Sequence, residues 1–444
     1  MSYVIIGNST AAIAAIEGIR QHDKKTSATV ISDEPYHTYS RPLISYYLGG
    51  KVTQDKIYYR GKDFYVKNHV DTILGMKAES IDTDNREVIL QNGNKVPYGK
   101  LLIATGGKPF IPPMQGLGKE NIFNFIKLDD VKSIEKVAKK NAKAVVIGAS
   151  FSGLKAVEAL VHRGVNVTVI DIMSRIMPRV FDETASSIAM KMLEDYGVEV
   201  LLNTTAERIL GEEKATGVQL KDGSVLPCDF VILAIGVRCN IDLVKDTKIK
   251  TNRGIIVDER MQTSIPGIYA AGDVAEGYNF VEDRMMEIAV IPNAYRQGET
   301  AGINMAGGQR LYNSGFIMNS MPLLGLSVIS AGVSEEREGI CTRIMYKPEE
   351  ESYRKFYIRN KKLVGYLLLN EIDRAGIYTD LIRNKTDITA FEDRIGEDGF
   401  GFAAFPKGMR KEKMLGVRSE TNVCRFSDNF FVQNFQKNGE YPDI

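Results

Sequence analysis

Cysteine is scarce in this chain, and its placement excludes several kinds of redox and metal chemistry. The four cysteines are Cys228, Cys239, Cys341 and Cys424, all in the second half of the 444 residues. Neither C-x-x-C nor C-x-x-x-x-C occurs, so the usual spacings of a zinc knuckle, an iron–sulfur ligand set or a redox disulfide are absent, and no metal site is expected. We therefore expect the thiols to be buried or incidental.

Long apolar runs and an excess of charge of one sign are also lacking. No stretch of eighteen apolar residues occurs, so we expect no membrane span. The 57 basic and 56 acidic residues nearly cancel, which argues against nucleic acid or an anionic membrane as the main partner. The chain opens with an apolar strand, Tyr3 to Gly7, and not with a basic and then apolar leader. A cytoplasmic protein is expected.

One pattern is present twice: an apolar strand, a glycine-rich turn, a small-residue helix and a strand that ends in an acid. The first turn reads G-N-S-T-A-A from Gly7, a relative of G-x-G-x-x-G in which Ser9 and Ala12 replace two glycines. The next strand ends in Asp33 and Glu34, about 26 residues after Gly7, near the spacing at which an acid meets an adenosine ribose. We expect Glu34, or alternatively Asp33, to bind a ribose, with the pyrophosphate at the helix N-terminus.

The second copy begins at Gly148 and reads G-A-S-F-S-G, with Ser150 and Gly153 at the other two glycine positions. Its following strand ends at Asp171, 23 residues after Gly148, so two dinucleotide sites are predicted. An acid at this place favours the free 2′-hydroxyl of NADH, whereas an NADPH site usually has arginine. Arg175 is either a further cofactor contact or a structural arginine.

The stretch T-S-I-P-G-I-Y-A-A-G-D, from Thr263 to Asp273, predicts a turn, a short buried strand and a ligand-binding corner. Gly272 lets the backbone approach a ligand, and Asp273 can accept hydrogen bonds from a polyol. The stretch resembles the second FAD-contacting motif of the two-dinucleotide-domain flavoproteins related to glutathione reductase, ferredoxin reductases and NADH oxidases. The resemblance implies that Asp273 holds the ribityl chain of FAD.

Further segments extend this resemblance over roughly residues 1–385. Glu34 to Ser45 resembles a stretch of NADH-dependent ferredoxin and rubredoxin reductases, which implies that Arg41 and Pro42 lie against the flavin and its phosphates. The other segments that resemble cofactor contacts are Ala104-Thr105-Gly106, the strand end at Gly236 that closes the second domain, and the helix start with Pro292 and Ala294, whose amides would point toward the flavin.

Several departures from these relatives define the expected chemistry. Tyr46 stands where relatives place lysine or histidine beside the flavin, and Lys155 stands where many NADH oxidases have a glutamate beside the nicotinamide. We take Tyr46 and Lys155 as catalytic candidates; Glu158, one turn on, either joins that site or forms a surface pair with Lys155. No cysteine precedes Cys228 and no histidine follows His162, so the thiolate and the C-terminal His–Glu pair of the disulfide-reducing relatives are missing.

The resemblance implies an α/β fold with two Rossmann-like dinucleotide-binding domains of the glutathione reductase type, an α+β C-terminal domain and a tail. The NAD domain would be inserted in the FAD domain. The expected parts are residues 1–115 and 241–310 for FAD, 116–240 for NAD, 311–387 for a C-terminal interface domain and 388–444 for the tail. In the interface domain we expect strands at Leu323–Ile329, Arg354–Ile358 and Leu363–Leu369 and a helix at Ala375–Arg383.

The tail is rich in phenylalanine, with eight of the eighteen in the last 54 residues. It has no clear helical or strand period, so we expect its apolar groups to need a surface from elsewhere. It also contains a basic cluster, Lys407, Arg410, Lys411 and Lys413. Two interpretations stay open: a docking element for an acidic redox partner, or a wrap around its own subunit or a homodimer mate.

The expected function is that of an FAD-dependent, NADH-linked oxidoreductase of the rubredoxin and ferredoxin reductase type that works without a redox cysteine. NADH gives two electrons as hydride, iron–sulfur centres and rubredoxin accept one at a time, and flavin does both. The partner would be a rubredoxin, a ferredoxin or an iron–sulfur subunit of a larger enzyme, in a homodimer or a hetero-oligomer. The alternatives are a stand-alone NADH oxidase giving hydrogen peroxide and a non-catalytic, redox-sensing NAD-binding flavoprotein.

Overall fold

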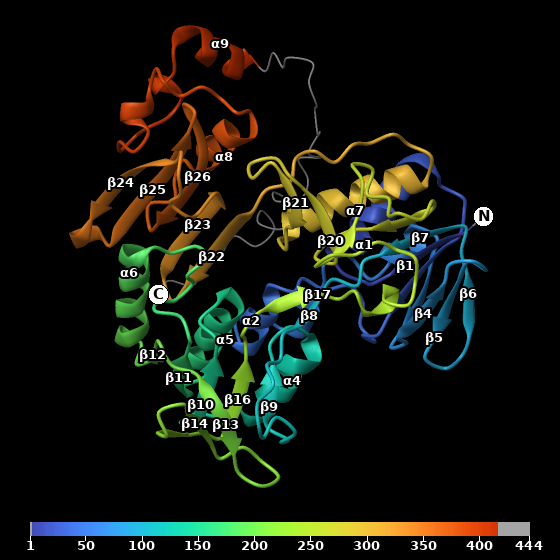
Figure 1. Cartoon of the computed structure of the whole chain (residues 1–444), viewed down its shortest axis with the longest axis horizontal. Helices are drawn as coiled ribbons and strands as arrows, with labels where there is room; N and C mark the ends of the chain where they lie inside the picture. The colour runs from blue at the N-terminus through green and yellow to red at the C-terminus, as the bar shows by residue number, and fades with distance from the viewer. Residues whose placement is uncertain (1, 416–444) are drawn as a thin grey trace. The chain divides into compact units, whose positions relative to one another are not determined.

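The computed structural model describes residues 2–415 and divides into two units, one that ends at Asp387 and one that begins at Ile388 (Figure 1). Three sheets of five strands account for most of the first unit. Within residues 2–415 the helices are too short or too polar to cross a bilayer.

The first sheet is parallel and has the order β19-β7-β1-β2-β3. Its strands are β1 (Tyr3–Ile6), β2 (Ala28–Ser32), β3 (Val70–Leu74), β7 (Lys100–Ile103) and β19 (Ile268–Ala270). The central strand β1 is apolar and buried along its whole length, as is typical of parallel strands with helices on both faces. Because β19 pairs with β7, a strand from late in the chain completes the sheet that begins at Tyr3. The expected insertion is confirmed.

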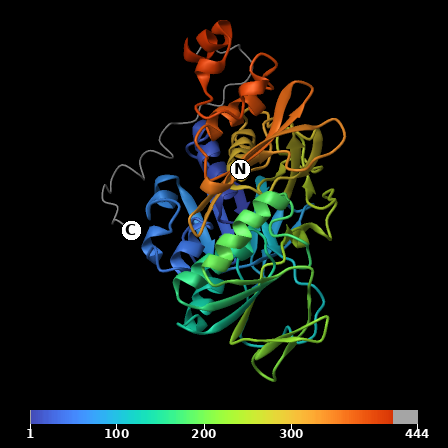
Figure 2. The same ribbon diagram turned by 90° about the vertical axis from the view of Figure 1, so that its left-hand side faces the viewer.

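The second sheet is also parallel, in the order β12-β11-β10-β16-β9. Its strands are β9 (Ile122–Asn124), β10 (Lys143–Ile147), β11 (Asn166–Ile170), β12 (Glu199–Leu201) and β16 (Phe230–Leu233). Its helices are α4 (Leu128–Val137), α5 (Phe151–His162) and α6 (Glu183–Asp195); α6 is the green helix nearest the viewer in Figure 2. Both sheets thus have the strand, turn and helix order of dinucleotide-binding domains.

The third sheet is antiparallel and has the order β22-β23-β26-β25-β24. Its elements are β22 (Met318–Leu323), β23 (Leu326–Gly332), β24 (Cys341–Lys347), β25 (Ser352–Arg359), β26 (Lys362–Leu369) and the helix α8 (Ala375–Arg383). The single strand expected at Leu323–Ile329 is wrong. A turn at Leu324 and Gly325, both with positive φ, separates β22 from β23, and β22 and β24 had no counterpart in the prediction.

Smaller elements surround these sheets. The remaining elements of the first unit are α1 (Thr10–His22), α2 (Leu43–Leu48), η1 (Gln54–Lys56), α3 (Phe64–Lys67), β4 (Ala78–Asp82), β5 (Glu87–Leu90), β6 (Lys95–Pro97), β8 (Gly107–Pro109), β13 (Ala206–Leu210), β14 (Gly217–Leu220), β15 (Val225–Pro227), β17 (Val237–Cys239), η2 (Asp242–Val244), β18 (Ile255–Ile256), β20 (Ala275–Asn279), β21 (Arg284–Glu287), α7 (Ile291–Met305) and η3 (Pro348–Glu350). The pair β8–β17 links the two dinucleotide parts (Figure 1).

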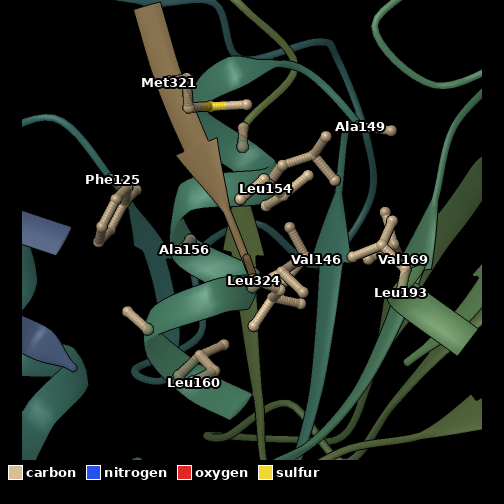
Figure 3. Close-up of a cluster of buried hydrophobic side chains, with 14 of the residues drawn as sticks. Phe125, Val146, Ala149, Leu154, Ala156, Leu160, Val169, Leu193, Met321 and Leu324 are labelled. Carbon is tan, nitrogen blue, oxygen red and sulfur yellow. The ribbon is translucent and has the colours of Figure 1, made fainter. Parts of the chain in front are cut away.

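The largest core lies around α5 and is shared with the third sheet. Leu154, Ala156 and Leu160 of α5 are fully buried, as is Val146 on the neighbouring strand β10. Met321 of β22 and Leu324 of the following turn belong to the same cluster, and Figure 3 shows both beside Leu154. The second dinucleotide part and the C-terminal sheet therefore share one hydrophobic core, which fixes β22 against α5.

The second unit is described as far as Leu415 and contains η4 (Glu392–Arg394), η5 (Phe402–Ala404) and α9 (Lys407–Leu415). Phe391, Phe400 and Phe405 are buried, and the rings of Phe391 and Phe405 are stacked with centroids 4.6 Å apart. Part of the apolar surface of the tail is thus covered within the unit itself. Phe430, Phe431 and Cys424 lie outside the described residues.

Candidate functional site

The first glycine turn joins β1 to α1 at the carboxyl edge of the first sheet. A Cβ on Gly7 would lie 2.1 Å from the carbonyl oxygen of Ala104, so only glycine lets these two chain segments approach. Ala12 is completely buried and packs the helix onto the sheet. Ser9 is the N-cap of α1, but its side chain makes no capping bond. The first amides of α1 are therefore placed to receive an anion such as a phosphate.

Asp273 lies where β19, α1 and α7 of the first dinucleotide part meet. The ideal Cβ of Gly272 would be 3.2 Å from Ala11 of α1 and 3.7 Å from Ala294 of α7, and the Gly272 amide donates to Gln297 Oε1 at 2.9 Å. Burial raises the pKa of Asp273, opposed by the charge of Arg41, and no donor among residues 2–415 relieves the carboxylate. A desolvated acid without a donor is costly, and the hydroxyl groups of a polyol would satisfy it. These residues fit the ribityl chain of FAD.

Helix α7 presents its N-terminus at the same corner. Its N-cap is Val290, and Pro292 lies in the first turn, where a missing N–H costs nothing. Cβ atoms added to Gly298 and Gly302 would each lie 2.1 Å from carbonyl oxygens of α1. The two helices therefore touch through their backbones, with Gly298, in the middle of α7, against the first turn of α1.

Each of the two acids expected to bind the ribose forms an ion pair with a basic side chain. Glu34 is buried and accepts from Arg41 Nη2 and from the Tyr39 hydroxyl, each at 2.6 Å. Asp33 is half-exposed and pairs with Lys127 at 2.6 Å. Glu34 thus fixes the guanidinium of Arg41 near Asp273, a role that the sequence did not indicate. Whether Glu34 or Asp33 meets the ribose stays a prediction, as does the contact of Pro42, the N-cap of α2.

The short ribbon β8–β17 has a predicted cofactor contact at each end. Thr105 Oγ1 donates to the carbonyl oxygen of Asn240 at 2.9 Å, and Gly106 directly precedes β8. Gly236 directly precedes β17 and accepts from the Phe110 amide at 2.9 Å. The antiparallel register places Gly106 and Gly236 at opposite ends of the ribbon. A Cβ on either glycine would meet nothing within 4 Å, so both face open space.

The second glycine turn repeats the geometry of the first. A Cβ on Gly153 would lie 2.0 Å from the carbonyl oxygen of Gly148, so this position must be glycine. Ser150 caps α5 by position and donates through Oγ to the carbonyl oxygen of Ala234 at 3.0 Å. Asp171 accepts from the Ala149 amide at 2.7 Å. The carboxylate therefore lies against the turn, at the place where an acid meets a ribose in this kind of fold.

Arg175 is bonded within its own loop and not to the carboxylate of Asp171. Its guanidinium donates to the carbonyl oxygens of Phe181 at 3.0 Å and Pro178 at 3.4 Å. Of the two interpretations of Arg175, this geometry favours the structural one.

A charge cluster of Tyr46, Lys51, Lys155, Glu158 and His162 lies where α2 packs on α5. Glu158 is only 7% exposed in its side chain and pairs with Lys155, with Lys51 at 3.4 Å and with His162 at 3.9 Å. Lys155 also donates to the carbonyl oxygen of Pro322 on β22 at 3.1 Å. Glu158 is therefore buried and the side chain of Lys155 is only 16% exposed, which contradicts the interpretation as a surface pair.

The ring of Tyr46 lies within cation–π distance of the ammonium groups of Lys51 and Lys155. Lys155 Nζ is 4.9 Å and Lys51 Nζ 5.6 Å from the centre of its ring. Burial and the charge of Glu158 raise the pKa of the phenol, so Tyr46 is a protonated hydroxyl near neutral pH. Sequence reasoning missed Lys51. The sequence feature that could have indicated Lys51 is its position shortly after α2, the helix that carries Tyr46.

Two of the three thiols within residues 2–415 have raised pKa values. Burial raises the pKa of Cys228 to about 11 and that of Cys239 to about 11, so both are poor nucleophiles at neutral pH. Cys341 is exposed on the edge strand β24. Within the described part of the chain no three His, Cys, Asp or Glu side chains are grouped to hold a metal.

The chain matches two family models. Residues 1–298 match pyridine nucleotide-disulphide oxidoreductase, and residues 318–386 match the rubredoxin NAD+ reductase C-terminal domain. The first match contains both glycine turns and the Gly272–Asp273 corner, which supports FAD and NAD(H) as the cofactors.

Individual relatives agree with this assignment. An assimilatory nitrate reductase electron transfer subunit of Bacillus subtilis is 33% identical over 89% of this chain, which spans only about half, 51%, of that protein. The NADH-dependent phenylglyoxylate dehydrogenase subunit epsilon of Aromatoleum evansii is 29% identical over 93% of this chain and 97% of its own length. The crystal structure of NADH:rubredoxin oxidoreductase from Clostridium acetobutylicum superposes with a TM-score of 0.73 at 26% identity, covering 89% of this chain and 98% of that one. The chain belongs to the pyridine nucleotide-disulphide oxidoreductase family, with the C-terminal domain of rubredoxin NAD+ reductases.

Proposed function

We propose that this chain is an FAD-dependent oxidoreductase that moves electrons between NADH and a one-electron iron–sulfur or rubredoxin-like partner, without a redox-active cysteine. The observation that carries the proposal is the pair of glycine turns, one on each parallel sheet, with the charge cluster where α2 packs on α5. The high pKa values of Cys228 and Cys239 support a reaction that uses no thiolate. Bound FAD would supply the exchange between a two-electron hydride and single electrons.

The cofactor contacts are part of this proposal. On the FAD side we assign Gly7, Ser9, Ala12, Asp33, Glu34, Arg41, Pro42, Ala104, Thr105, Gly106, Gly272, Asp273, Pro292 and Ala294. On the NADH side we assign Gly148, Ser150, Gly153, Glu158, Asp171 and Gly236. The division of the chain into residues 1–115 and 241–310, 116–240, 311–387 and 388–444 belongs to the proposal as well, as does a cytoplasmic location, where NADH is available.

Lys155 and Tyr46 are the proposed catalytic residues. Lys155 follows the second turn by two residues, and Tyr46 is on α2, which begins directly after Pro42. The helices α2 and α5 touch, because a Cβ on Gly49 would lie 3.5 Å from the Cα atom of Ala159. The cluster therefore lies between the flavin-side and NADH-side segments. Two lysines face one buried carboxylate, and the surplus positive charge would favour the negative charge that develops on reduction.

Two relatives support an iron–sulfur or rubredoxin-like partner. By its name, the matched Clostridium acetobutylicum protein transfers electrons between NADH and rubredoxin. The Aromatoleum evansii relative is by its name one subunit of an NADH-dependent dehydrogenase, and it matches over nearly its whole length. We infer that this chain serves as such a subunit or as a free reductase.

We propose that the second unit docks this partner. Helix α9 has four basic residues and one acid between Lys407 and Lys413. An acidic redox partner would be attracted to this helix, and the encounter rate would fall with added salt. Truncation after Asp387, at the boundary between the units, separates the two interpretations of the tail. Docking predicts unchanged reduction of a dye by NADH and loss of transfer to the partner, whereas a structural tail predicts unfolding, flavin loss or dissociation of a dimer.

The proposal as a whole is tested with purified, FAD-loaded protein under anaerobic conditions. NADH should bleach the flavin, and added rubredoxin or ferredoxin should be reduced at a rate well above that of oxygen under air. Slow bleaching would favour the redox-sensing alternative. Fast peroxide formation without transfer to either iron protein would favour a stand-alone NADH oxidase.

A further inference from the structure

A cavity of about 260 Å³ lies in the first unit between the loop Phe280–Asp283 and the turn of the β25–β26 hairpin. The loop follows β20, and the hairpin belongs to the antiparallel third sheet. Arg359 joins the two segments, because its Nη2 donates to the carbonyl oxygen of Val281 at 2.6 Å. The cavity is therefore formed where the flavin-side part meets the C-terminal sheet. Such junctions are common locations of small-molecule sites.

The lining of this cavity is strongly cationic. Arg359, Lys362 and Lys385 line it, and Asp283 is the one acid among the described lining residues. The carboxylate of Asp283 already accepts from the Tyr278 hydroxyl at 2.6 Å. Three positive charges against one negative charge leave the lining with an excess of two. Both lysines are exposed, and within residues 2–415 neither forms an ion pair with an acid. Asp387, which pairs with Lys362 through the backbone, is a further acid beside the lining.

An aromatic wall stands beside these cations. The ring of Phe280 meets Phe316 edge-on with centroids 5.4 Å apart, which holds its orientation. Lys385 Nζ lies 5.7 Å from the centre of the Phe280 ring. The cavity thus offers a partly apolar surface next to its charged groups. A ligand with an anionic end and an uncharged body would contact both.

The hydrogen-bond donors that line the cavity favour some anions over others. Arg359 uses one N–H on Val281 and has further N–H groups in its planar fork, which suits two oxygens of a phosphate. Lys362 and Lys385 add point charges from the hairpin and from the segment after α8. The volume is slightly below the ~300–1,000 Å³ of typical ligand sites, which limits the ligand to a small molecule. We propose that this cavity binds a small phosphorylated metabolite, with its phosphate between Arg359, Lys362 and Lys385 and its body against Phe280.

Calorimetric titration of the full-length, FAD-loaded protein tests this site. Saturating NAD+ is present throughout, so that the second dinucleotide site does not take up the probes. Pyrophosphate and AMP are titrated into the wild type and into the double variant Lys362→Gln/Lys385→Gln. The matched control is Lys361→Gln/Lys248→Gln, which removes the same charge from two exposed lysines, one of them in the same hairpin turn. Arg359 is left unchanged because it supports the loop.

The site predicts that both probes bind the wild type and that the double variant binds them about tenfold more weakly. The control should bind as the wild type does, and added salt should weaken binding. Absence of binding to the wild type, or an equal loss in the control, would overturn the proposal. Succinate serves as a dicarboxylate probe, and equal affinity for succinate and pyrophosphate would overturn the assignment to phosphate.

Discussion

Replacing Asp273 by alanine is expected to weaken FAD binding by roughly 10- to 150-fold. A hydrogen bond to a charged group typically contributes about 1.5–3 kcal/mol, and each 1.4 kcal/mol corresponds to a factor of ten in Kd. The carboxylate of Asp273 has no donor within residues 2–415, so the hydroxyl groups of FAD would be its hydrogen-bond donors. The flavin retained after gel filtration, and the Kd from fluorescence titration of the FAD-stripped protein, measure the effect.

The same substitution should have the opposite effect on the protein stripped of FAD. Burial raises the folded-state pKa of Asp273 above its ordinary value near 3.8. Between these two pKa values the folded protein binds more protons than the unfolded one, so the free energy of unfolding falls as pH rises through this window. At neutral pH the ionised carboxylate is therefore destabilising. Asp273→Asn should leave the thermal stability of the stripped protein unchanged or raised, and should lower that of the FAD-loaded protein.

This pair of effects distinguishes a cofactor contact from a structural acid. Asp84→Asn is the matched control, because Asp84 is 82% exposed in its side chain and lies in the turn between β4 and β5. It should change neither flavin retention nor stability by a measurable amount. Full retention of flavin in Asp273→Ala, or a loss of stability in the stripped protein, would refute the reasoning.

Three further changes follow from the described geometry. Asp171→Ala should erode the preference of the enzyme for NADH over NADPH, measured as the ratio of anaerobic flavin reduction rates, because an acid repels a 2′-phosphate; equal rates in the wild type would contradict this. Glu158→Gln should lower the pKa of the Tyr46 phenol, because burial and the charge of Glu158 together raise it, and should move the alkaline limit of flavin reduction to lower pH; an unchanged pH profile would remove Tyr46 from the site. Gly302→Ala should destabilise the fold by about 1–3 kcal/mol in urea unfolding, because its Cβ would lie 2.1 Å from an α1 carbonyl oxygen, whereas Gly376→Ala, which meets nothing within 4 Å, should not.

The two dinucleotide parts could be predicted from sequence because their signals are local. Buried parallel strands read as unbroken apolar runs, and a glycine turn with an acid about two dozen residues later fixes the order of elements. The insertion of one part in the other was also predictable, since Ala104 and Gly272 resemble contacts to the same cofactor; the pairing of β19 with β7 was not predicted. The strands of the third sheet were harder to predict from the sequence. The run from Leu323 to Ile329 is apolar except for Ser327. The turn that divides it has only Gly325 as a local signal, because leucine is rare at positive φ.

The contacts within the site depend on chain segments that are far apart in sequence. Lys155 and Glu158 look like a surface pair on a helix, and only the approach of Pro322, 167 residues later, buries them. Lys51 reaches Glu158 across 107 residues. No periodicity or motif in the sequence indicates such long-range contacts. The residue types were therefore predictable at this place, but their burial and partners were not.

The central claim is that electrons pass between NADH and a one-electron partner without a thiol. Its most direct test is a variant in which Cys228, Cys239, Cys341 and Cys424 are replaced by alanine or serine, loaded with FAD and mixed with NADH in a stopped-flow instrument without oxygen. The account predicts that the folded variant reduces its flavin and then rubredoxin or ferredoxin at rates close to those of the wild type. Loss of flavin reduction in a folded, FAD-loaded variant would contradict it.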